Sequence, residues 1–462
     1  MIFVTDNCHP SNELEKKPEK NPLGYTKAGD VKHCIRVTLS DYLSDKKDRK
    51  LLSLIADDEK TKNKNLENEL IIQTFYRDGK YYVETGNYLG RFNEGNVEIN
   101  IQSRFGNLLI KRMLSFANDV YLNDIKSLTE NDDTDDLSKF ILYYLFLQSL
   151  EKAYLLGLPK VYQSVQHHEP TLKGRFDVQR YIKNDIPFLG KLSSTSRELK
   201  EDQNIVDVLN RAVRIIEKEL PNLTTGISHI KPHLKSHCTK KYVSQQMINQ
   251  AKASKPLRNT LYAPYKKVLR YAEYIIQLNA LKDNNISNKE NSAGFLINVA
   301  ELFEIYVSKL LQRNFPDWSI SSPKIPLYET NFYSRKIIPD IVMEKDDAVI
   351  VFDTKYKRMR FQGKNTNGLG DVDRNDFFQI NTYMSYYQKQ QKNLLGGGLL
   401  YPLSETFKAT ESHSEYWLST KNTKTWFVID GIEVNDSKMK IDTLIENEKA
   451  FINRIKELAA QV

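Results

Sequence analysis

Two aspartates and a lysine lie in two short apolar segments of the C-terminal third of the chain. The first segment, Ile337 to Met343, contains Asp340, and the second, Ala348 to Tyr356, contains Asp353 and Lys355. Both segments are rich in β-branched residues, which are typical of strands. The short polar stretch that separates the segments predicts that they form a β-hairpin.

The geometry of such a hairpin brings the three charged side chains together. A two-residue turn at Asp346 and Asp347 would place Asp340 directly opposite Asp353. Lys355 would project from the same face as Asp353, because side chains alternate along a strand with period two. Like charges that face each other across a hairpin destabilise it, so a bound cation is expected to offset their repulsion. Mg²⁺ or Mn²⁺ is the predicted ion, because these cations prefer oxygen ligands.

This combination of groups predicts hydrolysis of a nucleic-acid phosphodiester. A metal held by Asp340 and Asp353 would lower the pKa of a bound water for in-line attack on a phosphate. Lys355 would orient that water or stabilise the developing negative charge. The alternative is a solvated surface hairpin with no chemistry, which the apolar residues flanking the aspartates disfavour.

Two predicted helices supply further candidates. Glu304 lies among apolar residues in a helical pattern over residues 296–314 and is a candidate third metal ligand. A second helix from Arg374 to Tyr383 places Gln379 and Tyr383 on one face at i, i+4 spacing. These two side chains could hydrogen-bond DNA or the surroundings of the lysine. The alternatives are an exposed Glu304 on the helix surface and a Tyr383 that belongs to the core.

The rest of the chain predicts a protein of mixed α and β structure with several domains. Residues 1–70 form a charged, variable segment with one strand at Cys34 to Leu39. Short β-branched and aromatic runs within residues 71–101 predict a β-meander or small barrel. Helical spacing follows at residues 107–121, 137–156, 204–220 and 262–283. Residues 174–198 look polar and turn-rich. Predicted boundaries near residues 70 and 285 divide the chain into segments 1–70, 71–285 and 286–462. The last segment is expected to form an α/β domain with a mixed sheet.

Composition narrows the class of protein without deciding its function. The chain has 462 residues, 40% of them hydrophobic, a net charge of +8 and a pI near 8.9. It is expected to fold, and its charge is compatible with a polyanionic partner. Three cysteines without CxxC spacing fit a cytoplasmic protein. No apolar run reaches the ~18 residues of a membrane span, and no P-loop motif is present.

One further cluster could bind metal. His229, His233, His237 and Cys238 recur at a spacing near four, which on a helix would align zinc ligands. Pro232 would interrupt such a helix, and the lysine-rich surroundings favour an exposed basic loop over residues 231–241. The sequence therefore favours the loop over a zinc site.

The hairpin and its flanking helices resemble a known group of nucleases. Pro339-Asp340, then Asp353-x-Lys355, the preceding Glu304 and the following Gln379-x-x-x-Tyr383 resemble the motif of the PD-(D/E)XK superfamily over roughly residues 295–403. The chain looks more closely like the McrC family, the nuclease subunits of modification-dependent restriction systems. The segments that carry this resemblance are Leu302 to Val307, Arg374 to Gln379, Leu399 to Pro402, Gly174 to Asp177 and Gly86 to Gly90.

This resemblance implies a two-component restriction system that defends against foreign DNA. Residues 286–462 would form a Mg²⁺-dependent PD-(D/E)XK endonuclease domain like that of restriction endonucleases. Residues 71–285 would dock onto a separate McrB-like AAA+ GTPase hexamer and stimulate it. The stimulating residue stays open among four arginines, which are Arg175, Arg197, Arg211 and Arg214. The alternatives are a stand-alone structure-specific nuclease or resolvase, and a non-catalytic activator of an AAA+ motor.

Overall fold

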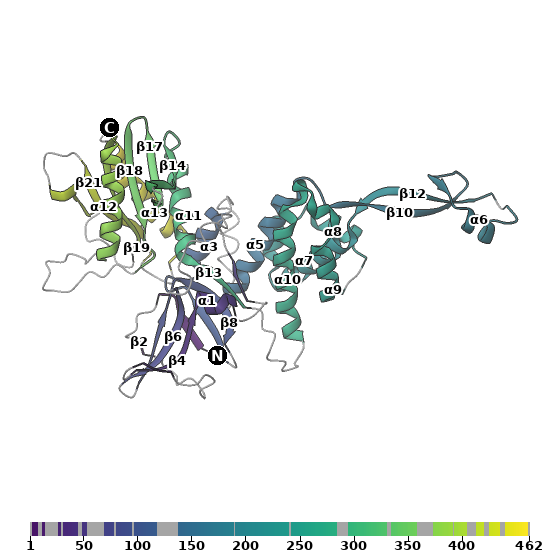
Figure 1. Ribbon diagram of the computed structural model, residues 1–462, viewed down its shortest axis with the longest axis horizontal. Helices are drawn as coiled ribbons and strands as arrows, with labels where there is room; N and C mark the ends of the chain where they lie inside the picture. Colours follow the sequence, from purple (N-terminus) through teal and green to yellow (C-terminus); the bar gives the residue numbers. More distant parts are fainter. Residues whose placement is uncertain are drawn as a thin grey trace. The chain divides into compact units, whose positions relative to one another are not determined.

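A computed structural model shows how the chain folds. It describes residues 2–7, 12–13, 26–28, 31–44, 49–52, 69–77, 80–94, 97–117, 137–188, 190–239, 242–283, 294–329, 334–357, 373–390, 392–403, 413–419, 425–434 and 439–460. The chain groups into two compact units (Figure 1). The first unit joins Met1–Ser138 with Lys289–Val462, and the second is Lys139–Asn288. The domain boundaries expected near residues 70 and 285 stay predictions.

The N-terminal part of the first unit contains two five-stranded sheets. One has the order β2-β7-β6-β4-β3 and the other β1-β9-β8-β13-β5. Their bounds are Ile2–Thr5 (β1), Asn12–Glu13 (β2), Thr26–Ala28 (β3), Val31–Thr38 (β4), Arg49–Leu52 (β5), Leu70–Arg77 (β6), Lys80–Thr85 (β7), Tyr88–Glu94 (β8), Val97–Gln102 (β9) and Gly294–Asn298 (β13), with a short helix α1 (Leu39–Ser44). The strand expected at Cys34 to Leu39 is confirmed as β4.

Of the two interpretations of residues 71–101, the β-meander is wrong in its connectivity, and the small barrel stays a prediction. The strands β6 and β7 form one antiparallel hairpin, and β8 and β9 form another. These hairpins lie in different sheets, because the chain passes from one sheet to the other at Gly86 and Asn87. A β-carbon on Gly86 would collide with the carbonyl of Leu70, so the crossing needs a glycine. Local alternation of side chains predicts strands but not the sheet to which each belongs.

The helix expected over residues 296–314 begins later than predicted. Residues Gly294–Asn298 form the strand β13, which pairs antiparallel with β8 and parallel with β5. The helix α11 (Val299–Asn314) follows, and the side chain of Asn298 caps it by accepting from the backbone N–H groups of Ala300 and Glu301. A continuous apolar run fits a buried strand as well as a helix, which explains the error.

The C-terminal part of the first unit is built on a six-stranded mixed sheet. Its order is β14-β17-β18-β19-β21-β20, in which β18, β19 and β21 run parallel and the other neighbours are antiparallel. The bounds are Ser319–Ser321 (β14), Ile341–Lys345 (β17), Ala348–Thr354 (β18), Asn393–Leu403 (β19), Trp426–Glu433 (β21) and His413–Tyr416 (β20). A separate hairpin joins β15 (Ile325–Glu329) and β16 (Ser334–Ile337). The mixed α and β architecture is as expected.

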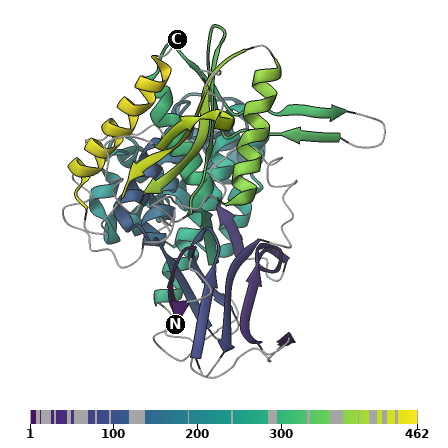
Figure 2. The ribbon, with the colours of Figure 1, turned by 90° about the vertical axis from the view of Figure 1, so that its left-hand side faces the viewer.

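The helices α12 (Arg374–Lys389) and α13 (Ile441–Ala459) cover opposite faces of this sheet (Figure 2). A β-carbon built on Gly396 would meet Leu458 of α13, and one built on Gly397 would meet Met384 of α12. Neighbouring residues of a strand point to opposite faces, so the two glycines identify the two sides of β19. The absence of side chains there lets both helices approach the central strand closely.

Replacing Gly397 with alanine is expected to destabilise the protein. The new methyl group would lie 2.8 Å from the Cγ atom of Met384 and 2.8 Å from the backbone oxygen of Val351. Overpacking of this kind costs roughly 1–3 kcal/mol. Chemical denaturation would measure the loss, with Gly226→Ala as the control because a methyl group there meets nothing within 4 Å. Equal unfolding free energies for the two variants would contradict close packing of α12 on β19.

A buried ion pair ties the helix α3 (Asn107–Ala117) to the C-terminal sheet. Arg112 donates two hydrogen bonds, of 2.6 and 2.5 Å, to the two carboxylate oxygens of Glu448 on α13. Tyr306 of α11 donates a third hydrogen bond, of 2.6 Å, to the same carboxylate. Because breaking a buried pair leaves an uncompensated charge, this cluster holds three helices in one arrangement.

The second unit combines a bundle of helices with a long β-hairpin. Its helices are α5 (Leu137–Tyr154), α7 (Gln203–Glu219), α8 (Lys231–His237), α9 (Gln245–Lys252) and α10 (Pro264–Asp283), with short 3-10 turns at Pro221–Thr225, Lys255–Arg258 and Thr260–Tyr262. The helix expected over residues 137–156 ends at Tyr154, and α7 and α10 lie where they were expected. The helix expected over residues 107–121 is confirmed as far as Ala117, and residues 118–121 lie outside the described residues. The basic loop expected at residues 231–241 is wrong, because α8 forms there.

The hairpin, called the arm below, replaces the polar, turn-rich segment expected at residues 174–198. It pairs β10 (Lys160–Glu169) with β12 (Leu192–Glu201) along ten residues each. A two-residue strand β11 (Arg175–Phe176) and the helix α6 (Val178–Asn184) complete its far end, away from the helices of this unit (Figure 1). No residue of β10 is buried, so the arm has no core along most of its length.

Side-chain hydrogen bonds hold the far end of the arm together. Asp185 is buried and accepts hydrogen bonds from the backbone N–H and the hydroxyl of Ser193, at 3.0 and 2.6 Å. His168 lies 2.5 Å from the other oxygen of the same carboxylate. The pKa of Asp185 is lowered, and the hydrogen bond from the Ser193 hydroxyl is the largest cause. Burial acts in the opposite direction. Such a network lets a two-stranded ribbon hold its shape without a core.

No helix in the described part of the chain is long and apolar enough to cross a membrane.

Candidate active site

The register expected for the hairpin is confirmed. Ile341 pairs with Phe352 and Lys345 with Ala348, so the turn lies at Asp346 and Asp347. The left-handed backbone of Asp346, with φ of 52°, makes this tight turn. Asp340 directly precedes β17, and the same register carries it to a position opposite Asp353.

Asp340 is held by the neighbouring strand. One of its carboxylate oxygens accepts hydrogen bonds from the backbone N–H of Thr354, at 2.8 Å, and from the Thr354 hydroxyl, at 2.9 Å. These bonds use Oδ2 and fix the direction of the side chain. The second carboxylate oxygen, Oδ1, takes no part in these two hydrogen bonds.

Asp353 is the buried centre of the site. Its side chain is 1% exposed, and neither carboxylate oxygen accepts a hydrogen bond. The Nζ atom of Lys355 lies 2.5 Å from Oδ2 as an ion pair, although its direction is not that of a hydrogen bond. Burial, together with the nearby Asp340 carboxylate, raises the pKa of Asp353 to about 8. A buried carboxylate without hydrogen bonds is costly, so a further positive ligand beside the Lys355 ammonium would stabilise it.

Lys355 contacts most of the charged and polar side chains of the site. Burial opposes its ammonium form, but the Asp353 carboxylate and other acidic neighbours outweigh this effect, so the pKa of Lys355 is raised. Its Nζ atom donates a 3.0 Å hydrogen bond to Oε1 of Gln379 and lies 3.3 Å from an oxygen of Asp376. Lys355 therefore stays protonated at neutral pH and works as a fixed cation rather than as a base.

The helix α12 aligns the polar side chains above the hairpin. Gln379 donates through Nε2 to the hydroxyl of Tyr383 at 2.7 Å, as the i, i+4 spacing predicted. Tyr383 in turn donates to the backbone oxygen of Ile338 at 3.3 Å. Its ring belongs to the core between α12 and the sheet, as the core interpretation of Tyr383 predicted, and its role in the site stays a prediction. Burial raises the pKa of Tyr383 to about 12, so its hydroxyl stays protonated.

Sequence reasoning missed Asp376 as a site residue. Asp376 is buried, and its second oxygen accepts a 2.8 Å hydrogen bond from Lys357. It is held in place at the start of α12, where the side chain of Asp373 caps the helix. Asp376 thus joins Lys355 and Lys357 in one charged network. Its position one turn before Gln379 on the same helix was the available signal.

Residues from the N-terminal part of the first unit support the end of β18. The backbone oxygen of Tyr356 accepts 3.0 Å hydrogen bonds from the side chains of Asn7 and Arg104. The Tyr356 ring packs edge-on against Phe105. The loop that follows Lys355 is therefore anchored by residues more than 200 positions away.

The contacts bring together five of the six predicted site residues, which are Asp340, Asp353, Lys355, Gln379 and Tyr383. Glu304 lies half-buried on α11, which packs against β14 and β18. Its role as a metal ligand stays a prediction.

The donor set fits a hard divalent cation. Two carboxylates face each other, and the buried one, Asp353, accepts no hydrogen bond at either oxygen, with Lys355 beside its Oδ2. Mg²⁺ and Mn²⁺ prefer oxygen ligands and keep several waters, so two carboxylates are enough protein ligands. Asp340 and Asp353 would hold the ion, and the ion would also relieve their mutual repulsion.

Comparison with known proteins identifies the family. The family described as McrBC 5-methylcytosine restriction system component matches residues 83–402, more than half of the chain. The chain belongs to this family. The resemblance to McrC segments is thereby confirmed, and the match covers both the arm and the candidate site. No curated protein matches the chain by sequence.

A solved structure shares the fold of this McrC-type chain. This structure is a refined half-complex from a tetradecameric assembly of Thermococcus gammatolerans McrB AAA+ hexamers with bound McrC. It is similar with a TM-score of 0.50 and 16% identity, over 87% of this chain and 89% of that chain. The cryo-EM structure of the Thermococcus gammatolerans McrBC complex matches with a TM-score of 0.32 and 16% identity, over 56% and 76%.

Truncating Gln379 in this McrC-type chain is expected to slow catalysis without abolishing it. Gln379→Ala removes the acceptor that positions the Lys355 ammonium and the donor to Tyr383. Misplacement of a catalytic group by about 1 Å lowers rates by up to roughly 100-fold. The expected result is a 10- to 100-fold lower kcat of DNA cleavage, on the order of that misplacement effect. A Gln379→Ala variant with unchanged kcat would show that Gln379 does not position the lysine.

Proposed function

We propose that this chain is the DNA-cleaving subunit of a cytoplasmic restriction system against foreign DNA. It hydrolyses phosphodiester bonds with Mg²⁺ at the hairpin site, through a domain of the PD-(D/E)XK type. The observation that carries this proposal is the buried Asp353 carboxylate, which lies opposite Asp340 with an ammonium group at 2.5 Å. Paired carboxylates and a lysine at one point suit phosphoryl chemistry and few structural roles.

The residues of the chain divide the catalytic work. A bound Mg²⁺ would supply Lewis acidity toward the phosphate and lower the pKa of a water nucleophile. Lys355, protonated and held by Gln379, stabilises negative charge that develops on the phosphate oxygens. Asp376 attracts the same ammonium group at 3.3 Å and, together with Asp353 at 2.5 Å, helps to fix its position. Burial around Asp353 strengthens each of these charge interactions.

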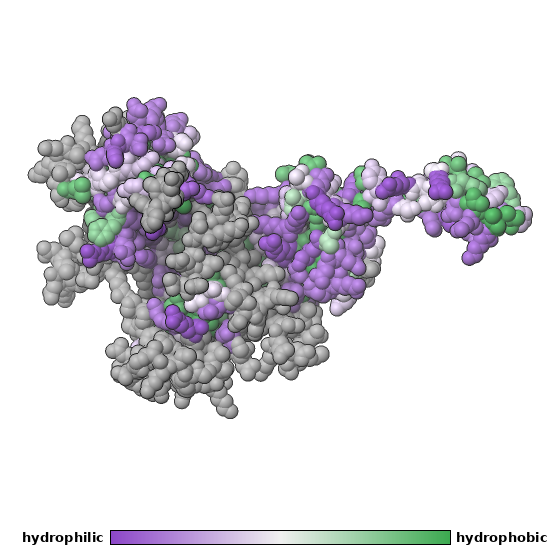
Figure 3. Space-filling model, in the orientation of Figure 1, coloured by the Kyte–Doolittle hydropathy of each residue, from purple (hydrophilic) through white to green (hydrophobic). Residues whose placement is uncertain are grey.

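The arm suits the partner interaction expected of this family. Its far end exposes five large apolar side chains, each more than half exposed, and they are Leu172, Val178, Ile182, Ile186 and Phe188. They form the hydrophobic patch at the end of the arm in Figure 3. Val178 and Ile182 lie one turn apart on α6 and so share a face. Exposed apolar patches of this kind mark protein-binding sites.

We therefore infer that the arm tip, defined by these five residues, docks onto a McrB-like AAA+ GTPase hexamer. The docked chain stimulates GTP hydrolysis, and the motor delivers DNA to the nuclease site. Arg175 and Arg197 are exposed on the arm, whereas Arg211 and Arg214 are half-buried on α7. The exposed pair is thus better placed to reach a partner.

Plasmid cleavage tests the proposed function directly. The purified chain is incubated with Mg²⁺ and plasmid DNA, with and without a McrB-like GTPase and GTP. Cleavage that needs both partner and GTP supports the proposal. Cleavage by the chain alone would make it a stand-alone nuclease or resolvase. Stimulation of GTP hydrolysis without any cleavage would make it a non-catalytic activator.

A further inference from the structure

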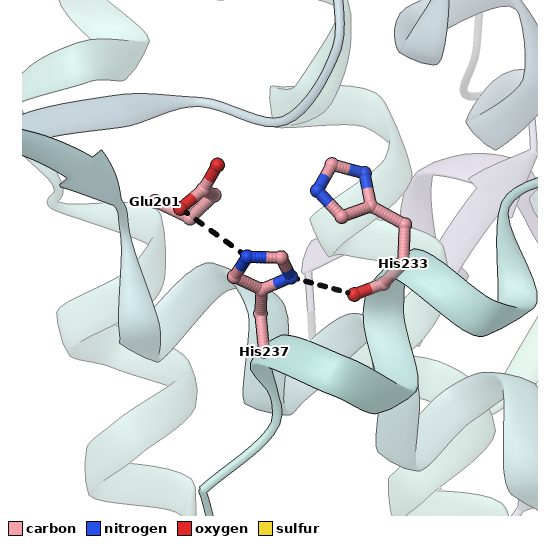
Figure 4. A group of neighbouring side chains, drawn as sticks. All are labelled: Glu201, His233 and His237. Atoms are coloured by element: carbon pink, nitrogen blue, oxygen red, sulfur yellow. Dashed lines mark hydrogen bonds and ion pairs between the residues drawn. The ribbon is translucent and has the colours of Figure 1, made fainter.

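A second group of metal-binding side chains lies in the second unit, outside the proposed nuclease site. It consists of Glu201, His233 and His237 (Figure 4). One ligand atom from each residue lies within 4.8 Å of the other two. Glu201 is the last residue of β12, at the root of the arm, and both histidines belong to α8. Three donors from two separate elements therefore face one point.

The helix α8 aligns the two histidines. His233 and His237 are four residues apart, so they share one face of the helix. Pro232 does not interrupt α8, because it stands in the first turn, where its missing N–H is not needed. His229 and Cys238, which have similar spacing in the sequence, are not members of the group.

Hydrogen bonds orient both imidazole rings with one nitrogen toward the shared point. The Nδ1 atom of His237 donates to the backbone oxygen of His233 at 3.0 Å, which leaves the lone pair on Nε2. The Nδ1 atom of His233 lies 2.6 Å from the hydroxyl of Tyr154, so its Nε2 atom is also left over. Histidines that bind metals characteristically use their second nitrogen in this way.

The surrounding contacts hold the group in place before any ion binds. Gln203 donates to the backbone oxygen of His237 at 2.7 Å. The buried Asp207 of α7 accepts from the backbone and hydroxyl of Thr239, just after α8. Glu201 Oε2 lies 3.7 Å from Nε2 of His237. The end of α8 is thus fixed against α7, and Glu201 faces it from β12.

We propose that Glu201, His233 and His237 form a binding site for a transition-metal ion of the Zn²⁺ class. Two imidazole nitrogens and one carboxylate oxygen suit Zn²⁺, whereas Mg²⁺ prefers oxygen ligands alone. The side chains of His237 and Glu201 are 40% and 19% exposed, so an ion can enter and keep a water as its fourth ligand. The bound ion links the root of the arm to α8 and steadies the arm on its helical base.

The competing interpretation is an ordinary ion pair between a protonated His237 and Glu201. Metal binding by the full chain separates the two. The Asp353→Asn variant serves as the background and Mg²⁺ is kept in excess, so that the nuclease site does not contribute. We expect one Zn²⁺ per chain in competition with a chromogenic chelator, and a Co²⁺ complex with the visible absorption of four-coordinate cobalt. Zn²⁺ should also raise the melting temperature.

Matched variants make the proposal falsifiable. His237→Ala and Glu201→Gln should lower Zn²⁺ affinity at least about tenfold, the loss typical of weakened metal sites. His229→Ala is the control, because His229 contacts Tyr154 but lies outside the group. Circular dichroism of the metal-free proteins confirms that each variant folds. Zn²⁺ binding that is absent in the wild type, or equal in all variants, would overturn the proposal.

Discussion

Asp353→Asn is expected to abolish DNA cleavage while leaving the fold intact. The amide has the shape of the carboxylate but cannot carry its charge, so it holds Mg²⁺ poorly and no longer pairs with Lys355. Loss of one electrostatic group of this kind costs roughly 100- to 1,000-fold in kcat, and loss of the ion adds to it. Gel-based plasmid cleavage with the GTPase partner, GTP and Mg²⁺ measures the effect.

Two controls separate loss of chemistry from loss of structure. Stimulation of GTP hydrolysis by Asp353→Asn should match the wild type, because the arm tip and the site are built by different residues. Asp347→Asn changes the same residue type in the exposed turn of the same hairpin, and it should cut DNA normally. If Asp353→Asn also cut like the wild type, the assigned site would be wrong.

The pH dependence of the stability of the folded protein tests the environment of the Asp353 carboxyl group independently of cleavage. Burial and Asp340 raise the pKa of Asp353 to about 8 in the folded protein, whereas an unfolded chain has an ordinary value near 3.8. The folded state therefore holds a proton that the unfolded state has released. This contribution to stability is complete below about pH 4 and is lost as the pH rises through 8.

Thermal unfolding in EDTA between pH 5 and 9, a range chosen to span roughly the Asp353 transition, tests this expectation. Over this range the wild type should lose stability relative to Asp353→Asn, whose side chain carries no charge. Mg²⁺ should reverse the loss at the alkaline end, since the cation replaces the proton between the carboxylates. Parallel stability curves for the two proteins would show that Asp353 titrates like an exposed carboxyl group.

Charged substitutions at the arm tip are expected to uncouple the chain from the proposed GTPase partner. Ile182→Asp and Phe188→Asp place a charge in a patch whose side chains are 61% and 58% exposed. Burying an unpaired charge in an interface costs several kcal/mol, enough to lower affinity at least about 100-fold. Stimulated GTP hydrolysis and GTP-dependent cleavage should therefore both be lost. Titration of the partner, followed by GTPase rate, measures the change.

A surface control guards against unspecific effects of added charge. Leu261→Asp alters an equally exposed apolar residue, 58% exposed, elsewhere in the second unit. It should stimulate the partner normally, and the melting temperatures of all three variants should equal that of the wild type. Normal stimulation by Ile182→Asp and Phe188→Asp would place the docking surface somewhere other than the arm tip.

The sequence alone determined the hairpin that carries the candidate site. Its register follows from a two-residue turn and from strict alternation of side chains, and both are local properties of about 17 residues, within the length of a typical hairpin. Asp340, Asp353 and Lys355 therefore meet whatever else the chain does. The i, i+4 pair of Gln379 and Tyr383 is local in the same way, because helix geometry places both on one face.

Tertiary structure decided those features that depend on contacts between residues far apart in the sequence. The apolar run from Phe295 to Ile297 fits a helix as well as a strand, so only the pairing of this segment with β8 and β5 makes it a strand. The sequence of the arm shows no alternation of apolar and polar residues, because its strands have no core on either face. Hydrogen bonds and cross-strand contacts stabilise these strands instead. Asp353 lost its hydrogen-bond partners, and Glu201 met His233 and His237, only when separate elements packed together. Burial and contacts between remote segments are properties of the packed chain, and they set the chemistry of both proposed sites.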